Sequence, residues 1–143
     1  MAVFTYERKV QYYETDQMGI VHHSNYIKWF EETRLALMEN IGIEYDKMEE
    51  DGILIPVLSA SCEYRIAFRY GDTFKVEAFP VEFNGIKMKI GYRVFHKETG
   101  ALHSVGETSH CFVDKEMKLV RMKKEYPQYY HIFEQWNAQK DAE

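Results

Sequence analysis

A polar segment at residues 12–26 holds side chains that could do chemistry. It carries one carboxylate at Asp16, followed by Gly19 and by two adjacent histidines, His22 and His23. A carboxylate beside the start of a helix can activate a water as a general base, or can attack a carbonyl itself. The unpaired N–H groups of the first helical turn would polarise the carbonyl oxygen. Taken alone, an aspartate in such a loop is more often a turn residue or a helix N-cap than a catalytic group.

The two histidines suggest a second chemistry, metal binding or proton relay. Neighbouring side chains at a helix start diverge by about 100°. No cysteine or carboxylate completes a familiar ligand spacing with His22 and His23. We therefore expect no metal site, and we expect His22 to be a surface or pocket-wall residue.

A long helix is predicted directly after this segment. From Asn25 to Ile41 the large apolar residues recur at steps of three and four, and Gly42 follows where a helix is expected to stop. Before the segment, apolar and polar residues alternate from Phe4, which predicts a half-buried strand in which Arg8 is the one exception to the pattern. The segment is therefore predicted to be a strand-to-helix connection.

Antiparallel strands dominate the rest of the chain. A short helix or turn is expected over Glu44–Asp51, and alternation predicts strands over Leu58–Phe68, Phe74–Phe83, Ile86–Val94 and on to about Val113. Asn84-Gly85 and Thr99-Gly100 are hairpin signals, and the apolar set shifts at Phe79-Pro80, which indicates a bulge. A terminal amphipathic helix is expected over Tyr126–Trp136. One long helix with such strands predicts an α+β fold, a curved sheet wrapped around a central helix.

Composition narrows the classes of function. The 143 residues carry 18 Lys+Arg against 23 Asp+Glu, so a nucleic-acid partner has little support. The N-terminal ten residues are too charged for a secretory leader, and no segment approaches the ~20 apolar residues of a membrane span. We expect a cytoplasmic protein with no membrane partner, a single domain over residues 1–143, and free thiols at Cys62 and Cys111.

The polar segment also resembles the active-site signature of a known family. The matching residues are Tyr13, Thr15-Asp16, Gly19-Ile20-Val21, His23, Asn25-Tyr26 and Trp29-Phe30-Glu31. They resemble the 4-hydroxybenzoyl-CoA thioesterase family, which has the hot-dog fold, and the likeness in element order extends from about Val3 to about Met122. The resemblance implies an acyl-CoA thioesterase with no metal and no cofactor, because CoA is part of the substrate.

The resemblance assigns roles to individual positions. Asp16 corresponds to the catalytic base or nucleophile, and the backbone N–H of His23 to the group that polarises the thioester carbonyl. Gly19 would allow the tight turn between them. Asn25 or Ser24 would cap the helix, and we place Asn25 and Tyr26 beside the substrate.

Two further positions follow from the same resemblance. Arg69 is expected near the nucleotide part of CoA. Ser59, with Ser61 as the alternative, lies on the strand that approaches the partner's active site in a hot-dog dimer. The family also implies a homodimer or a homotetramer. Left open are a hot-dog dehydratase or a non-catalytic acyl-thioester binding module, the acyl group, and CoA or acyl-carrier protein as the carrier.

Overall fold

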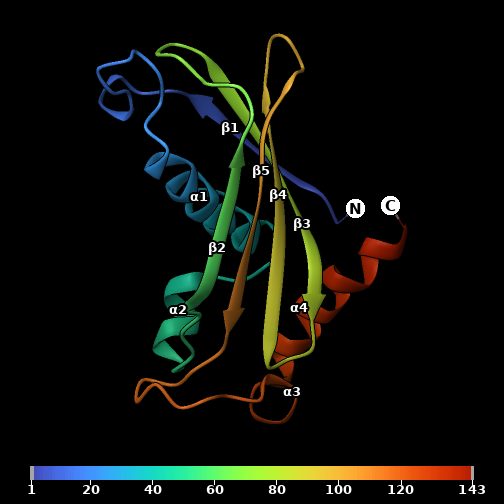
Figure 1. Cartoon of the computed structure of the whole chain (residues 1–143). Helices are drawn as coiled ribbons and strands as arrows, with labels where there is room; N and C mark the ends of the chain where they lie inside the picture. Colours follow the sequence, from blue (N-terminus) through green and yellow to red (C-terminus); the bar gives the residue numbers. More distant parts are fainter. Residues whose placement is uncertain (1, 143) are drawn as a thin grey trace.

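A five-stranded antiparallel sheet carries a long helix across one face in the computed structural model, which describes residues 2–142 (Figure 1). The strand order is β1-β3-β4-β5-β2. The strands are β1 (Phe4–Lys9), β2 (Val57–Tyr64), β3 (Thr73–Phe83), β4 (Lys87–His96) and β5 (Leu102–Cys111). The α+β prediction and the hot-dog arrangement are confirmed.

The central helix α1 (Ser24–Asn40) ends one residue before the predicted limit. Its apolar side lies against the sheet, where Trp29 stacks on Phe74 at 3.9 Å and Phe30 stacks on Tyr92 at 4.2 Å between ring centroids. Fully burying one such side chain contributes roughly 1.5–3 kcal/mol. The close approach of Phe30 requires the missing side chain of Gly106, because a Cβ there would lie 2.5 Å from the ring.

The bulge and the turn predicted for the central strands are confirmed. The β3–β4 register shifts between Pro80 and Glu82, as expected for the bulge. At the following turn the side chain of Asn84 accepts hydrogen bonds from two backbone N–H groups, and Gly85 has a φ of 85°. This left-handed conformation suits glycine.

One predicted strand is shorter than expected. The alternation over Leu58–Phe68 continues to its end, yet β2 stops at Tyr64. Beyond it, the N–H groups of Arg65 and Ile66 both donate to the His103 carbonyl, so the chain leaves the ladder. Residues 66–69 instead turn toward the segment that carries Asp16.

Shorter elements complete the fold. They are the 3₁₀ helices η1 (Tyr12–Glu14) and η2 (Gln139–Ala142), and the helices α2 (Tyr45–Glu50), α3 (Met122–Glu125) and α4 (Pro127–Ala138). Helix α4 is the terminal helix expected over Tyr126–Trp136, and it packs Phe133 against Phe83 and Phe112. Cys62 and Cys111 are both free. None of the helices within residues 2–142 has the length and apolar character needed to cross a bilayer.

Candidate active site

Backbone pairing holds the loop between β1 and α1 in one conformation. Thr15 pairs with Val21 and Ile20 pairs with Arg69 as isolated antiparallel bridges. The N–H of Asp16 donates to the Ile20 carbonyl at 2.9 Å, and the N–H of Val21 donates to the Phe68 carbonyl at 2.9 Å. These hydrogen bonds therefore hold the loop together and attach it to the residues that follow β2.

Asp16 stands at the start of a tight turn within this loop. Its Oδ1 accepts the N–H of Met18 at 2.8 Å, and its carbonyl accepts the N–H of Gly19 at 2.9 Å. Gly19 has a φ of 78°, a left-handed conformation that other residues adopt at a cost. The half-buried carboxylate keeps Oδ2 without a hydrogen bond from any described residue.

The start of α1 provides a free backbone donor. The N–H of Ser24 donates to His22 Nδ1 at 3.2 Å, and the N–H of Asn25 donates to the His22 carbonyl at 3.0 Å. Within residues 2–142 no acceptor engages the N–H of His23. Such an N–H at a helix start carries part of the positive end of the helix dipole.

The prediction that Asn25 or Ser24 caps the helix is wrong. His23 occupies the N-cap position, and neither Ser24 nor Asn25 caps the helix with its side chain. The Ser24 hydroxyl pairs with His22 Nδ1, while the Asn25 amide donates to the carbonyl of Glu14 at 2.9 Å. The buried amide is therefore used to anchor the loop, because the loop runs close to the first helical turn.

A buried carboxylate that was not singled out from the sequence supports this arrangement. Glu14 is 2% exposed, and its carboxylate accepts hydrogen bonds from both terminal nitrogens of Arg8, at 3.0 and 2.8 Å. It also accepts the N–H of Gln11 and the Trp29 indole N–H, each at 2.8 Å. Burial raises the pKa of Glu14, but these hydrogen bonds outweigh it, so the net effect lowers the pKa.

Arg8 is the signal that could have revealed this network. It interrupts the alternation of the first strand, and its guanidinium bridges Glu14 to Glu32, which accepts at 2.7 Å. The backbone carbonyl of Glu14 also accepts the N–H of His22 at 2.8 Å. The network thus links β1, α1 and the loop on either side of Asp16.

A cavity of about 370 Å³ opens beside Asp16 and the start of α1. Three of the predicted site residues, Asp16, His23 and Tyr26, line it together. Its other lining residues are Met18, Ile20, Val21, Tyr64, Arg65, Ile66 and Ala67. Burial raises the pKa of Tyr26 to about 12, so this phenol is neutral at physiological pH.

Part of the cavity wall was missed by the sequence analysis. Tyr64 closes the cavity from β2, where its hydroxyl donates to the His23 carbonyl at 3.2 Å. Arg65 brings a positive charge to the wall, and its Nε donates to Glu63 at 2.9 Å. The alternating pattern gives no signal for either residue, because both contacts depend on where β2 ends.

The remaining predicted residues lie outside the lining. The side chain of Asn25 is committed to the loop, and Arg69 is exposed beside Gly19. Ser59 is exposed on β2, where its hydroxyl pairs with that of Ser109 on β5. The His22 and His23 rings stack at 4.2 Å, and among the described residues no group of three potential metal ligands occurs.

Comparison with known proteins gives the class to which this fold and site belong. The chain is 38% identical over 135 residues to YneP of Bacillus subtilis (strain 168), a protein provisionally named an acyl-CoA thioesterase, covering 94% of this chain and 97% of that one. It is 27% identical over 120 residues to a 1,4-dihydroxy-2-naphthoyl-CoA hydrolase of Trichodesmium erythraeum (strain IMS101), covering 80% and 85%. The crystal structure of a DHNA-CoA thioesterase from Staphylococcus aureus superimposes with a TM-score of 0.92 at 27% identity, covering 98% and 94%. The class is that of the thioester hydrolases.

The family is defined by a match over most of the sequence. Residues 10–129 match the thioesterase-like superfamily, a range that includes the Asp16 loop, α1 and all of the sheet except β1. The chain belongs to this superfamily.

Proposed function

We propose that this chain is an acyl-CoA thioesterase in which Asp16 and the backbone of His23 act on the same thioester carbonyl. One observation carries the proposal: Asp16 and His23 line one cavity, and no acceptor among the described residues engages the N–H of His23. An N–H at that point is suited to the oxyanion that forms when the carbonyl is attacked. Loss of one such donor typically costs ~10²–10³ in rate.

Hydrolysis then needs one oxygen nucleophile and one leaving group. With Asp16 as general base, it takes a proton from water, the water oxygen bonds to the acyl carbon, and the carbon–sulfur bond breaks to release the CoA thiolate, which is then protonated. With Asp16 as nucleophile, its oxygen bonds to the acyl carbon and the carbon–sulfur bond breaks, which releases the CoA thiolate and leaves an acyl anhydride. Water then opens the anhydride to give the free acid and the Asp16 carboxylate. Both routes need this carboxylate in nearly the same position.

The nature of the substrate is a finer proposal. The residue pattern around Asp16 supports membership of the 4-hydroxybenzoyl-CoA thioesterase family. The names of the two relatives described above favour CoA as the carrier. Met18, Ile20 and Ile66 give the cavity an apolar wall suited to an alkyl or aromatic acyl group. Arg65, on the cavity wall, and Arg69, outside it, are the cations we assign to the CoA phosphates.

We further propose a cytoplasmic homodimer or homotetramer. The outer edge of β2 is unpaired among the described residues, and Val57 and Leu58 are 47% and 54% exposed. An exposed strand edge with apolar side chains is suited to pairing with a second copy. Ser59 lies on this edge, where it would reach the partner's acyl group or attacking water.

The test is the release of free thiol from a panel of acyl-CoAs that differ in chain length and aromaticity. We expect Asp16→Asn to lower kcat/KM by about a hundredfold or more, because the amide cannot act as a base or nucleophile. Asp46→Asn, a change at an exposed residue on α2, is the matched control. Turnover that is indifferent to Asp16, or no turnover of any thioester by the folded protein, would refute the proposal.

The hot-dog dehydratase gains no support from the site. That chemistry calls for a histidine paired with a carboxylate on the central helix. His23 lines the cavity beside Asp16, but no carboxylate of α1 is among the lining residues. A non-catalytic binding module would not need a carboxylate on the cavity wall, so the Asp16→Asn experiment separates it from the enzyme.

A further inference from the structure

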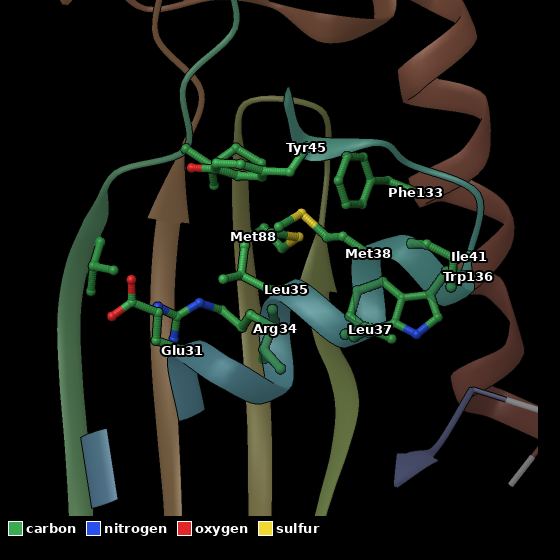
Figure 2. A pocket seen from close by; sticks show the side chains of 13 residues that line it. Glu31, Arg34, Leu35, Leu37, Met38, Ile41, Tyr45, Met88, Phe133 and Trp136 are labelled. Atoms are coloured by element: carbon green, nitrogen blue, oxygen red, sulfur yellow. The ribbon is translucent and has the colours of Figure 1, made fainter. Parts of the chain in front are cut away.

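A second cavity lies at the other end of α1, between α1, α4 and the sheet. Its volume is about 170 Å³, and it shares no lining residue with the cavity beside Asp16. In Figure 2 Phe133 and Trp136 of α4 close one side, while Arg34 and Glu31 lie on the side of β2 and β5. Apolar side chains make up most of the wall between them.

The size of this cavity indicates the size of its ligand. An engineered apolar cavity of about 150 Å³ stays dry and binds benzene. A space of about 170 Å³ is therefore suited to an apolar group of about six carbon atoms. Met38 and Met88 both line it, and methionine side chains adapt readily to different ligand shapes.

The cavity also contains a positive charge that forms no salt bridge within the described residues. Arg34 is half-buried, and within residues 2–142 no carboxylate lies within 4 Å of its guanidinium. Its one side-chain hydrogen bond is donated to the Tyr92 hydroxyl at 3.2 Å. Four of the five guanidinium N–H donors are left without a partner among the described residues.

The groups behind Arg34 do not neutralise it. The Tyr92 hydroxyl pairs with Thr108 at 2.7 Å, and Thr108 pairs with Nε2 of His110 at 2.8 Å. Burial, followed by the nearby charge of Arg34, lowers the pKa of His110 to about 4, so this histidine is neutral at physiological pH. The series of hydrogen-bonded side chains from Arg34 to His110 therefore carries one charge, that of the guanidinium.

We propose that this cavity binds a small free carboxylate, with an apolar body of about six carbons among Met38, Met88 and Trp136 and its charged head on Arg34. A planar guanidinium can hold a carboxylate through two parallel N–H donors. Glu31 lines the same cavity and competes for Arg34. The proposal does not depend on thioester hydrolysis, although hydrolysis would release acids of this class.

Methionine-methyl NMR can test the site directly with hexanoate as the probe. Met38 and Met88 report on this cavity and Met18 reports on the cavity beside Asp16. We expect hexanoate to shift the Met38 and Met88 methyl signals saturably. The neutral 1-hexanol, which has the same apolar body, should bind at least about tenfold more weakly, because it cannot form the charged hydrogen bonds.

Two variants separate the contribution of the ligand's carboxylate to binding from that of its apolar body. Arg34→Met should lower the affinity for hexanoate about 10- to 100-fold and leave the affinity for 1-hexanol unchanged. Glu31→Gln should raise the affinity for hexanoate by about two- to fivefold, because it removes the competing carboxylate. If Arg34→Met does not fold, the alcohol comparison and Glu31→Gln still decide the question.

Three results would overturn the proposal. They are hexanoate shifts confined to Met18, equal affinities for hexanoate and 1-hexanol, and a folded Arg34→Met protein that binds hexanoate as the wild type does. Shifts at both Met38 and Met18 with only the former lost in Arg34→Met would support it, because the two cavities would then bind separately.

Discussion

Replacement of Glu14 by glutamine should destabilise the protein strongly at neutral pH. Glutamine keeps the shape of the glutamate side chain but carries no charge. Its NH₂ group would face N–H donors, with which it cannot form a hydrogen bond. The carboxylate is 2% exposed and accepts four hydrogen bonds, two of them from Arg8. Among the described residues, the change leaves Arg8 with Glu32 as its one remaining ionic partner.

The magnitude follows from the burial of the ion pair. Breaking a buried pair by removing one partner costs about 3–5 kcal/mol. The Arg8 side chain is 22% exposed and retains Glu32, so we take the low end, about 3 kcal/mol. At roughly 3 °C per kcal/mol for a domain of this size, the Tm should fall by about 10 °C.

The loss should depend on pH in a definite direction. Because the folded protein lowers the pKa of Glu14, its carboxylate stabilises the fold above the unfolded value of about 4.3 and ceases to do so as the pH falls through the folded value. The difference in unfolding free energy between wild type and Glu14→Gln should therefore be largest near pH 7 and should shrink below about pH 4.

Urea denaturation at pH 7 and pH 3 measures both quantities. Glu116→Gln is the control, since the Glu116 side chain is 77% exposed and its substitution should change stability by less than about 0.5 kcal/mol. A loss for Glu14→Gln below about 1 kcal/mol at pH 7, or one of the same size at both pH values, would contradict the reasoning.

Three further substitutions test packing around the site. Gly106→Ala places a Cβ 2.5 Å from the buried Phe30 ring and 2.6 Å from the Ser61 carbonyl, so it should cost about 1–3 kcal/mol in urea denaturation. Gly91→Ala, whose close contacts are confined to one half-buried ring, should cost less; equal losses would show that the Ser61 carbonyl adds no strain. Asn25→Ala removes a buried amide that anchors the loop and should lower both stability, by about 1–3 kcal/mol, and kcat for thioester hydrolysis. An unchanged kcat would show that the Asp16 turn does not need this anchor.

Local signals in the sequence predicted most of the fold. The spacing of apolar residues located α1 to within one residue at each end, and Asn84-Gly85 and Phe79-Pro80 marked a turn and a bulge that the structure confirms. These features are set by interactions between residues close in the chain. The end of β2 was misplaced because it depends on His103, far along the sequence.

The candidate site was predictable to a smaller extent. The family resemblance singled out Asp16, His23 and Tyr26, which line one cavity. The same resemblance does not separate a residue at the cavity from one that supports it, and Asn25 belongs to the second kind. Glu14 escaped notice because a carboxylate in a loop gives no sign of burial until its partner on β1 is identified.

The strand order also bears on how the protein folds. Strands β3, β4 and β5 follow one another through short connections, whereas β1 and β2 pair with β3 and β5 across long stretches of chain. Contacts between distant residues carry the larger loop-closure entropy, so we expect the three central strands to associate first and the two edge strands to join last. The Asp16 loop is attached to both late elements, since it follows β1 and rests on the residues after β2. Amide hydrogen exchange should therefore find the Asp16 loop opening at a lower free energy than the β3–β4–β5 ladder.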